Sequence, residues 1–221
     1  MKLGNVELSW LGHSGFLIND RKAIYIDPYN ITRNEPKADI ILITHSHYDH
    51  CSIADIEKIV KDGTKIILTP DCQSKITKFN HKIEMQIIEP GQEIKLGSIR
   101  INSVPAYNLS KSFHPKNENW LGYVIKFENV ILYHAGDTDC IDEMKNLTGY
   151  AKKGNEFIAL LPVGGNYTMN AEEAAKAASI IKPTLAIPMH YGSIAGSKED
   201  AEKFVELCRE MGVRAEIMEK S

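Results

Sequence analysis

The chain has 221 residues, of which 43% are hydrophobic and 25% are charged, and its formal net charge is -3. A chain of this length can bury the core of one domain, so we expect a single domain over residues 1–221. The small negative charge excludes a general attraction to nucleic acid or to anionic membranes. No stretch has the roughly 18 uninterrupted apolar residues of a membrane span, and the amino-terminus lacks a signal-peptide pattern. The sequence therefore predicts a cytoplasmic protein with neither nucleic acid nor membrane as a partner.

The first part of the chain reads as short strands separated by turns, with strands expected over residues 6–11, 15–19, 22–27 and 39–44. The last of these, DIILIT, is continuously apolar, which is typical of a strand covered on both faces. Helices should therefore pack outside the sheet. Ser52 can cap a helix over residues 53–61 that stops at Asp62-Gly63, and another buried strand follows over residues 65–69.

A second run of strands is expected between Ile83 and Gly136, over residues 84–88, 93–96, 99–104, 121–127 and 130–136. It contains a polar loop over residues 109–119, and loops of that length are often functional. Beyond it we expect strands over residues 157–162, 184–189 and 214–218 and helices over residues 171–181 and 198–211. This order favours two sheets sandwiched between helices over a single parallel sheet.

Four potential metal ligands fall within six residues directly after the strand at 39–44, in the stretch THSHYDH. His45 and His47 are two residues apart in nearly extended backbone, so they project to the same side and can reach one ion. The chain then turns, which lets Asp49 and His50 point to a second place nearby. Without metal, three imidazoles and a carboxylate at one rim would each need separate hydrogen-bond partners. Such ligands suit zinc, manganese, iron or nickel.

The stretch THSHYDH resembles the H-x-H-x-D-H signature of the metallo-β-lactamase superfamily. HAGDT, which contains Asp137, and IPMHYG, which contains His190, follow in the order expected for that family, and WLGHSGFLI extends the similarity over nearly the whole chain. Within this superfamily, the sequence resembles above all the small stand-alone hydrolases related to ascorbate-6-phosphate lactonase. The resemblance implies an α/β fold, a four-layer αβ/βα sandwich of two mixed β-sheets flanked by helices.

The resemblance also implies two divalent metal ions per chain, with zinc as the first candidate and manganese or nickel as alternatives. The ligands that it assigns are His45 and His47 for the first ion, Asp49, His50 and His190 for the second, and Asp137 as a bridge between both. The ordinary alternatives are a turn aspartate for Asp137 and a strand-end histidine for His190.

One ligand of the first ion departs from the family pattern. The family usually places it where this chain has Asn108, and His114 follows six residues later in the polar loop. An amide oxygen binds a divalent ion more weakly than a neutral imidazole does, so we expect His114 to be the ligand. The alternatives are that Asn108 completes the site, or that His114 is a mobile loop residue.

Three further histidines have less specific surroundings. His13 lies in LGHSG between two strands, where we expect it to contact a ligand or the substrate, and His134 can orient a ligand by hydrogen bonding. A satisfied buried histidine is the alternative for both. His81 lies in a polar stretch, and no function is assigned to it.

The expected reaction is hydrolysis of a small ester or lactone by a metal-bridging hydroxide, with Asp49 orienting the hydroxide and receiving its proton and with His13 nearby. One alternative is a phosphodiesterase. Another is a metal-binding or diiron redox protein without hydrolytic activity, although redox relatives tend to have an acidic residue at the position of His47. The substrate is expected to be a small molecule. The sequence does not determine the identity of the substrate. It also leaves the oligomeric state open, with a homo-oligomer as one of the alternatives.

Overall fold

The computed structural model describes residues 1–32, 34–77, 79–152 and 154–221. The chain forms two compact units, one of Met1–Glu89 with Glu219–Ser221 and the other of Pro90–Met218. Each unit contains one mixed sheet, so the prediction of two mixed sheets is confirmed. The expected single domain over residues 1–221 stays a prediction. In the described part of the chain, no helix is both long enough and apolar enough to cross a membrane.

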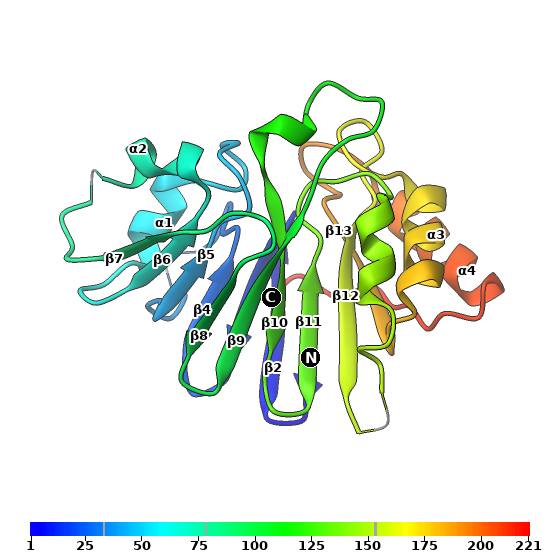
Figure 1. The fold of residues 1–221 in the computed structure, drawn as a ribbon, viewed down its shortest axis with the longest axis horizontal. Helices are drawn as coiled ribbons and strands as arrows, with labels where there is room; N and C mark the ends of the chain where they lie inside the picture. The colour runs from blue at the N-terminus through cyan, green and yellow to red at the C-terminus, as the bar shows by residue number, and fades with distance from the viewer. Residues whose placement is uncertain (33, 78, 153) are drawn as a thin grey trace. The chain divides into compact units, whose positions relative to one another are not determined.

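The sheet of the first unit has seven strands, which lie side by side in chain order (Figure 1). They are β1 (Lys2–Leu3), β2 (Val6–Gly12), β3 (Gly15–Asn19), β4 (Ala23–Ile26), β5 (Ile40–Leu42), β6 (Lys65–Leu68) and β7 (Glu84–Ile87). Strands β1 to β4 pair antiparallel, whereas β4 to β7 pair parallel. The parallel half is joined through α1 (Ile53–Ile59), a 3₁₀ turn (Pro70–Cys72) and α2 (Gln73–Ile76).

The core of the first unit explains why the apolar segments become central strands. Strand β5 is buried along its whole length, as the continuous apolar run predicts. Ile41 and Ile66 belong to the same hydrophobic cluster as Ile56 and Ile59 of α1, so the helix covers the parallel half of this sheet. A helix face that buries two isoleucines in this way contributes several kcal/mol, at about 1.5–3 kcal/mol for each side chain.

Three details of this unit differ from the sequence-based expectation. Helix α1 ends at Ile59 instead of reaching residue 61, because Val60 already has extended backbone. Ser52 is the residue before the helix, but its hydroxyl donates to Asp55 Oδ2 at 2.6 Å and caps no backbone amide. The segment 84–88 is grouped with the second run of strands in the sequence analysis, but it belongs to the sheet of the first unit, because β7 pairs parallel with β6.

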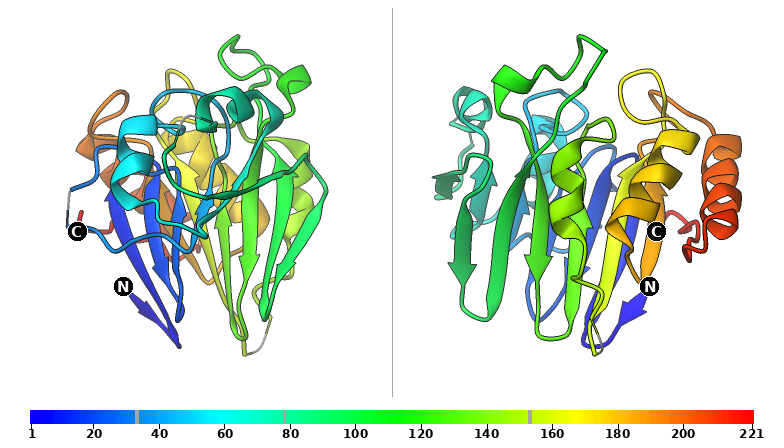
Figure 2. Two further views of the ribbon diagram at one scale, coloured as in Figure 1. Left: turned by 90° about the vertical axis from the view of Figure 1, so that its left-hand side faces the viewer. Right: turned by 45° about the vertical axis from the view of Figure 1, so that its right-hand side comes forward.

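The sheet of the second unit has six strands in the order β13-β12-β11-β10-β9-β8. They are β8 (Glu93–Leu96), β9 (Ile99–Pro105), β10 (Leu121–Lys126), β11 (Val130–His134), β12 (Glu156–Pro162) and β13 (Leu185–Met189). Strands β8 to β11 pair antiparallel and β11 to β13 pair parallel. The helical elements are 3₁₀ turns at Lys116–Glu118 and Asp142–Leu147, α3 (Ala171–Ile181) and α4 (Lys198–Glu210), with α3 and α4 side by side (Figures 1 and 2).

Both long helices begin where the sequence predicts. Asn170 and Glu173 form a reciprocal capping box at the start of α3, and Ser197 and Asp200 form another at the start of α4. Each box satisfies two backbone amides that the first helical turn leaves without partners. Helix α3 ends at Ile181, and the next residue, Lys182, has left-handed backbone (φ 54°) and precedes a proline.

The strand expected over residues 214–218 does not form. Ala215 makes only an isolated parallel bridge to Ala186 of β13, with hydrogen bonds from Ala186 N to Arg214 O and from Glu216 N to Ala186 O. The alternating sequence is suited to a strand, but a strand requires a continued ladder, and the chain leaves the β13 edge after this one bridge.

Candidate functional site

Polar side chains of the first unit gather after the carboxyl ends of β4 and β5 and at the β2–β3 turn. We call this group the N-terminal cluster; its members are His13, Asp27, His45, His47, Asp49 and His50. All except His47 are buried. The carboxyl end of parallel strands is where open α/β sheets commonly bind ligands.

The side chains of His45 and His47 meet. His45 Nε2 lies 3.0 Å from His47 Nδ1, and the two ring centroids are 4.7 Å apart. The ring of His50 also lies beside that of His45, at a centroid distance of 4.1 Å. The loop that carries these histidines is held by Lys75, whose ammonium group donates to the carbonyl of Ser46. Nitrogen atoms this close can bind the same ion.

Asp27 is a functional candidate that the sequence analysis missed. Its Oδ2 accepts from the Thr44 hydroxyl at 2.6 Å and lies 2.8 Å from His50 Nδ1, and its Oδ1 accepts from Thr44 N at 2.9 Å. The same hydroxyl lies 2.9 Å from His45 Nδ1. A carboxylate only accepts, so His50 donates through Nδ1, and the hydroxyl, having donated to Asp27, accepts from His45 Nδ1. One buried carboxylate therefore leaves Nε2 of both histidines with its lone pair, as a metal ligand requires.

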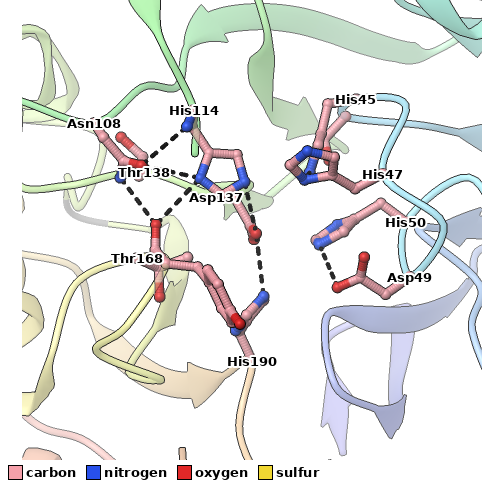
Figure 3. A network of polar contacts seen from close by, with 12 residues as sticks. His45, His47, Asp49, His50, Asn108, His114, Asp137, Thr138, Thr168 and His190 are labelled. Atoms are coloured by element: carbon pink, nitrogen blue, oxygen red, sulfur yellow. Dashed lines mark hydrogen bonds and ion pairs between the residues drawn. The ribbon is translucent and has the colours of Figure 1, made fainter. Parts of the chain in front are cut away.

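His13 lies at the tip of the β2–β3 hairpin and contacts Asp49. Its backbone is left-handed (φ 53°), and the indole nitrogen of Trp10 donates to its carbonyl at 3.0 Å. Its Nε2 is 2.9 Å from Asp49 Oδ2, and His50 Nε2 is 3.5 Å from the same oxygen (Figure 3 shows the second contact). Asp49, which is 7% exposed, thus accepts a hydrogen bond from His13 and lies beside Nε2 of His50. Left-handed backbone at a non-glycine residue is uncommon and is often found at functional sites.

In the second unit, Asp137 is the centre of a C-terminal cluster with Asn108, His114 and His190 (Figure 3). Asp137 Oδ2 is 3.2 Å from His114 Nε2 and 3.1 Å from His190 Nε2, and all three side chains are at most 3% exposed. His190 directly follows β13 with left-handed backbone (φ 59°). Gly164, after β12, makes room for it, because a Cβ there would lie 2.6 Å from the carbonyl oxygen of His190. Burial raises the pKa of the neighbouring Tyr191 hydroxyl to about 12, so this group stays neutral.

The structure places His114 and Asn108 in contact with each other. His114 is 1% exposed, so its side chain is buried, whereas a mobile loop residue would be exposed. Its Nδ1 lies 3.1 Å from both Asn108 Oδ1 and the Tyr167 carbonyl, while the Asn108 amide donates to Asp139 Oδ1 and Tyr167 O at 3.0 Å. Asn108 therefore holds the ring of His114 with its Nε2 at Asp137. Neither Asp139 nor Tyr167 was a sequence-based candidate, since nothing local marks a residue that acts on a distant loop.

The two remaining histidines differ in their surroundings. His134 Nδ1 accepts from the backbone amide of Gly136 at 3.2 Å, so this buried side chain shapes the turn that leads to Asp137. His81 is on the surface, 3.4 Å from Asp62, and belongs to neither cluster.

Comparison with known proteins identifies the family of this chain. A family model described as "Beta-lactamase superfamily domain" matches residues 7–190. A UPF0173 metal-dependent hydrolase of Thermococcus kodakarensis is 34% identical over 220 residues, which cover 96% of this chain and 95% of that protein. The chain belongs to the metallo-β-lactamase superfamily. Within the superfamily it is a member of the UPF0173 family of metal-dependent hydrolases.

Solved structures of superfamily members show the same fold. A protein from Parabacteroides distasonis superposes with a TM-score of 0.84 at 31% identity, covering 98% of this chain and 94% of its own. The metallo-β-lactamase fold protein YhfI from Bacillus subtilis, at 12% identity, superposes with a TM-score of 0.71 over 95% of this chain and 90% of its own. The predicted fold class is therefore confirmed: two mixed sheets with flanking helices in a metallo-β-lactamase fold.

Proposed function

We propose that this metal-dependent hydrolase cleaves a small ester or lactone with the help of two divalent metal ions, zinc being the first candidate. The ligands are His45, His47, Asp49, His50, His114, Asp137 and His190. Support comes from the H-x-H-x-D-H signature and from the donor atoms that each unit gathers. The observation that carries the proposal is Asp49, a buried carboxylate within the ligand loop that accepts from His13 and lies 3.5 Å from Nε2 of His50.

The donor sets fit divalent metal ions. Each cluster combines neutral imidazoles with at least one buried carboxylate, the ligand types that zinc, manganese and nickel accept. A buried carboxylate such as Asp137 is costly unless a positive charge compensates it, and a metal ion supplies that charge. The buried hydrogen bonds that Asp27 and Asn108 accept from His50 and His114 orient the imidazoles before any ion binds, which lowers the entropy cost of binding.

The roles of the residues follow from these contacts. Bound divalent ions would lower the pKa of a coordinated water towards roughly 7, which would make a nucleophile available at neutral pH. Asp49, a carboxylate within the ligand loop, would accept the proton of that water. His13 holds Asp49 through the 2.9 Å contact to Oδ2 and keeps it from rotating away. Hydrolysis by this route needs no Ser or Cys nucleophile.

A substrate screen tests this function. Protein reloaded with zinc, manganese or nickel is assayed on esters, lactones, amides and phosphodiesters, and the bound metal is counted by elemental analysis. We expect two ions per chain and turnover of esters or lactones. Saturation at one ion, or turnover confined to phosphodiesters, would contradict the proposal, and the second result would assign a phosphodiesterase.

Asp27→Asn should weaken both metal sites. The asparagine has only one acceptor oxygen, so it cannot accept all three hydrogen bonds that Asp27 accepts from Thr44 N, the Thr44 hydroxyl and His50 Nδ1. The hydrogen bonds that fix the tautomers of His45 and His50 are therefore disturbed together. We expect metal affinity to fall by about 10- to 100-fold, as for other residues that orient metal ligands. Metal titration followed by competition with a chelator measures this. Asp39→Asn is the matched control, because the Asp39 carboxylate also accepts from a backbone amide, that of Ala23, and from Lys61, and it belongs to neither cluster. Equal affinity in the two variants would show that Asp27 only stabilises the fold.

His114→Ala should remove one ion and leave the other bound. The variant loses one imidazole while Asp49, His50 and His190 stay in place. Asn108→Ala should have a smaller effect in the same direction, because His114 keeps the Tyr167 carbonyl as a partner for Nδ1. Site-resolved metal titration of both variants decides between the two residues. A larger loss in Asn108→Ala than in His114→Ala would make Asn108 the ligand.

A further inference from the structure

The second unit contains a buried carboxylate, Asp139, to which the proposed function assigns no role. It lies two residues after the proposed ligand Asp137 and is 4% exposed. Its Oδ1 accepts from the Asn108 amide at 3.0 Å and from Lys111 Nζ at 2.6 Å, and its Oδ2 accepts from Leu109 N at 2.8 Å. Burial of a carboxylate is costly unless it is hydrogen-bonded and a positive charge compensates it. These donors meet both conditions and hold the Asp139 carboxylate in one orientation.

All of these donors come from the segment that leads to His114, and backbone contacts join the same two parts of the unit. Asp139 N donates to the carbonyl of Tyr107 at 2.9 Å, and Tyr107 N donates to the hydroxyl of Thr138 at 3.2 Å. The turn after β11 is therefore attached to the start of the loop after β9 by main chain and side chains together. Asp139 is the residue of that turn whose side chain reaches Asn108.

Asp139 favours one orientation of the Asn108 amide. An asparagine side chain presents an NH₂ donor on one side and an acceptor oxygen on the other. Asn108 Nδ2 faces two acceptors, Asp139 Oδ1 and the Tyr167 carbonyl, each at 3.0 Å. Asn108 Oδ1 faces the backbone N and the ring Nδ1 of His114, both at 3.1 Å (Figure 3). An amide rotated by 180° would turn its oxygen towards the Asp139 carboxylate, and hydrogen bonds to a carboxylate are stronger than neutral ones.

The orientation of Asn108 in turn sets that of the His114 ring. Because Asn108 Oδ1 only accepts, the ring donates from Nδ1, and Nε2 keeps the lone pair that a metal ligand needs. In metal sites, a carboxylate or carbonyl behind the imidazole holds the ring and fixes its tautomer. Asp27 does this to His50 directly, at 2.8 Å. Asp139 stands one step further back, with the Asn108 amide between the carboxylate and the imidazole.

Lys111 connects the same carboxylate to a third segment. Its Nζ donates to Asp139 Oδ1 and also to Thr168 O at 3.0 Å. The residue before Thr168 is Tyr167, whose carbonyl lies 3.1 Å from His114 Nδ1. The side chain of Lys111 is 22% exposed, so the ion pair is largely shielded from water. Asp139 therefore joins the loop of His114 to the segment that supplies the second acceptor for its ring.

We propose that Asp139 is a positioning residue for His114: through the Asn108 amide, it holds the imidazole in the orientation and tautomer that metal binding requires. The inference rests on the proposed function, in which His114 is a metal ligand. Asp139 acts through two other side chains and takes no part in the bond-breaking step. The alternative is a carboxylate that only stabilises the loop.

Asp139→Asn tests the inference with a nearly isosteric change. The single oxygen of the new amide cannot accept from Asn108, Leu109 N and Lys111 together, so the Asn108 amide loses its fixed orientation. We expect the affinity for the ion that His114 binds to fall by about 10- to 100-fold, as for other residues that orient metal ligands. The affinity for the other ion should be unchanged. Site-resolved titration with zinc measures both.

Glu143→Gln is the matched control. The Glu143 carboxylate also ties this loop down, but it accepts from the Tyr107 hydroxyl at 2.9 Å and from Lys116 Nζ at 3.2 Å instead of from the Asn108 amide. A residue that merely anchors the loop should behave as Glu143 does. We therefore expect wild-type zinc affinity in Glu143→Gln, and an equal loss in Glu143→Gln and Asp139→Asn would overturn the inference.

A spectroscopic readout in the metal-free protein is independent of turnover. The His114 ring is buried and donates from Nδ1, so this proton should exchange slowly with water and give a resolved ring N–H resonance, assigned by its absence in His114→Ala. We expect the resonance to broaden or vanish in Asp139→Asn and to persist in Glu143→Gln. The Tm of each metal-free variant shows whether its fold is intact. An unchanged resonance with wild-type zinc affinity in Asp139→Asn would overturn the inference.

Exchange of the two side chains tests the contact between positions 108 and 139. Asn108→Asp keeps an acceptor for His114 but places two carboxylates opposite each other, so it should weaken the same ion, and it tests the contact even if Asp139→Asn fails to fold. The double variant Asn108→Asp, Asp139→Asn again pairs one donor with one acceptor. It should bind that ion about tenfold more tightly than Asn108→Asp alone, the equivalent of one hydrogen bond to a charged group. Wild-type affinity in Asn108→Asp, or no recovery in the double variant, would contradict the inference.

The same measurements separate this inference from the proposed function. Loss of the ring resonance and of one ion in Asp139→Asn, with no hydrolysis of any ester or lactone by the wild-type protein, would support the inference and overturn the proposed reaction. Hydrolysis by a wild-type protein whose Asp139→Asn variant binds both ions normally would leave the proposed function standing and overturn the inference. Full zinc affinity in His114→Ala would overturn the ligand assignment and the inference together.

Discussion

Asp49→Asn should lower kcat by about 10²- to 10⁴-fold on any ester or lactone that the wild-type protein cleaves, the range for loss of a general base. The amide is almost isosteric with the carboxylate, so the fold should be kept, but it cannot accept a proton and is a weaker ligand. Steady-state kinetics on protein of measured metal content gives the result. Asp142→Asn, a change at a carboxylate whose side chain is 89% exposed, is the matched control and should keep wild-type turnover. Wild-type kcat in Asp49→Asn at full metal content would exclude the assigned role.

The contact between His13 and Asp49 adds a second readout to that experiment. If His13 acts only by holding Asp49 Oδ2, His13→Ala should lower kcat in the wild-type background but have little further effect in Asp49→Asn. Residues that act through one another are strongly non-additive in this way. Additive losses would mean that His13 has a separate role, such as direct contact with the substrate.

Asp137→Ala should reduce the affinity for both ions by more than roughly 10- to 100-fold, the loss that is typical when a residue that hydrogen-bonds to a metal ligand is changed. The larger loss is expected because the variant lacks a proposed bridging ligand. His114 Nε2 and His190 Nε2 also lose the carboxylate that lies 3.2 Å and 3.1 Å away. Metal titration with elemental analysis measures the loss. A variant that keeps two ions and full activity would make Asp137 a turn residue.

Thermal unfolding gives an independent measure of the same change. A metal that binds only the folded state stabilises it by RT ln(1 + [L]/Kd), which is about 2.7 kcal/mol at 100 times Kd. Zinc should therefore raise the Tm of the wild-type protein, and the increase should be largely lost in Asp137→Ala. The metal-free Tm of Asp137→Ala shows whether the fold itself is intact, with Asp142→Ala as the control.

Several parts of this molecule are determined by local sequence. Strand β5 is continuously apolar because parallel strands are buried on both faces. Helices α3 and α4 begin at Asn170 and Ser197 because each of these residues has an acidic partner three positions later. The motif THSHYDH brings His45 and His47 together because spacing and extended backbone are local properties. Patterns of this kind depend on neighbours within a few residues and can be recognised from the chain alone.

Other parts depend on contacts between segments that are distant in sequence. Asp27 joins Thr44 and His50, which are 17 and 23 residues away, and Asn108 reaches the carbonyl of Tyr167, which is 59 residues away. Of Asn108 and His114, the two candidates for a ligand of the first ion in the sequence, His114 is the one whose Nε2 lies 3.2 Å from Asp137, and the path of its loop decides this contact. The segment 214–218 has a strand-like pattern but gains only one bridge at the β13 edge. Which polar groups meet in the interior is decided by strand order and by the paths of loops, since a buried donor or acceptor takes whichever partner the tertiary structure brings within hydrogen-bonding distance.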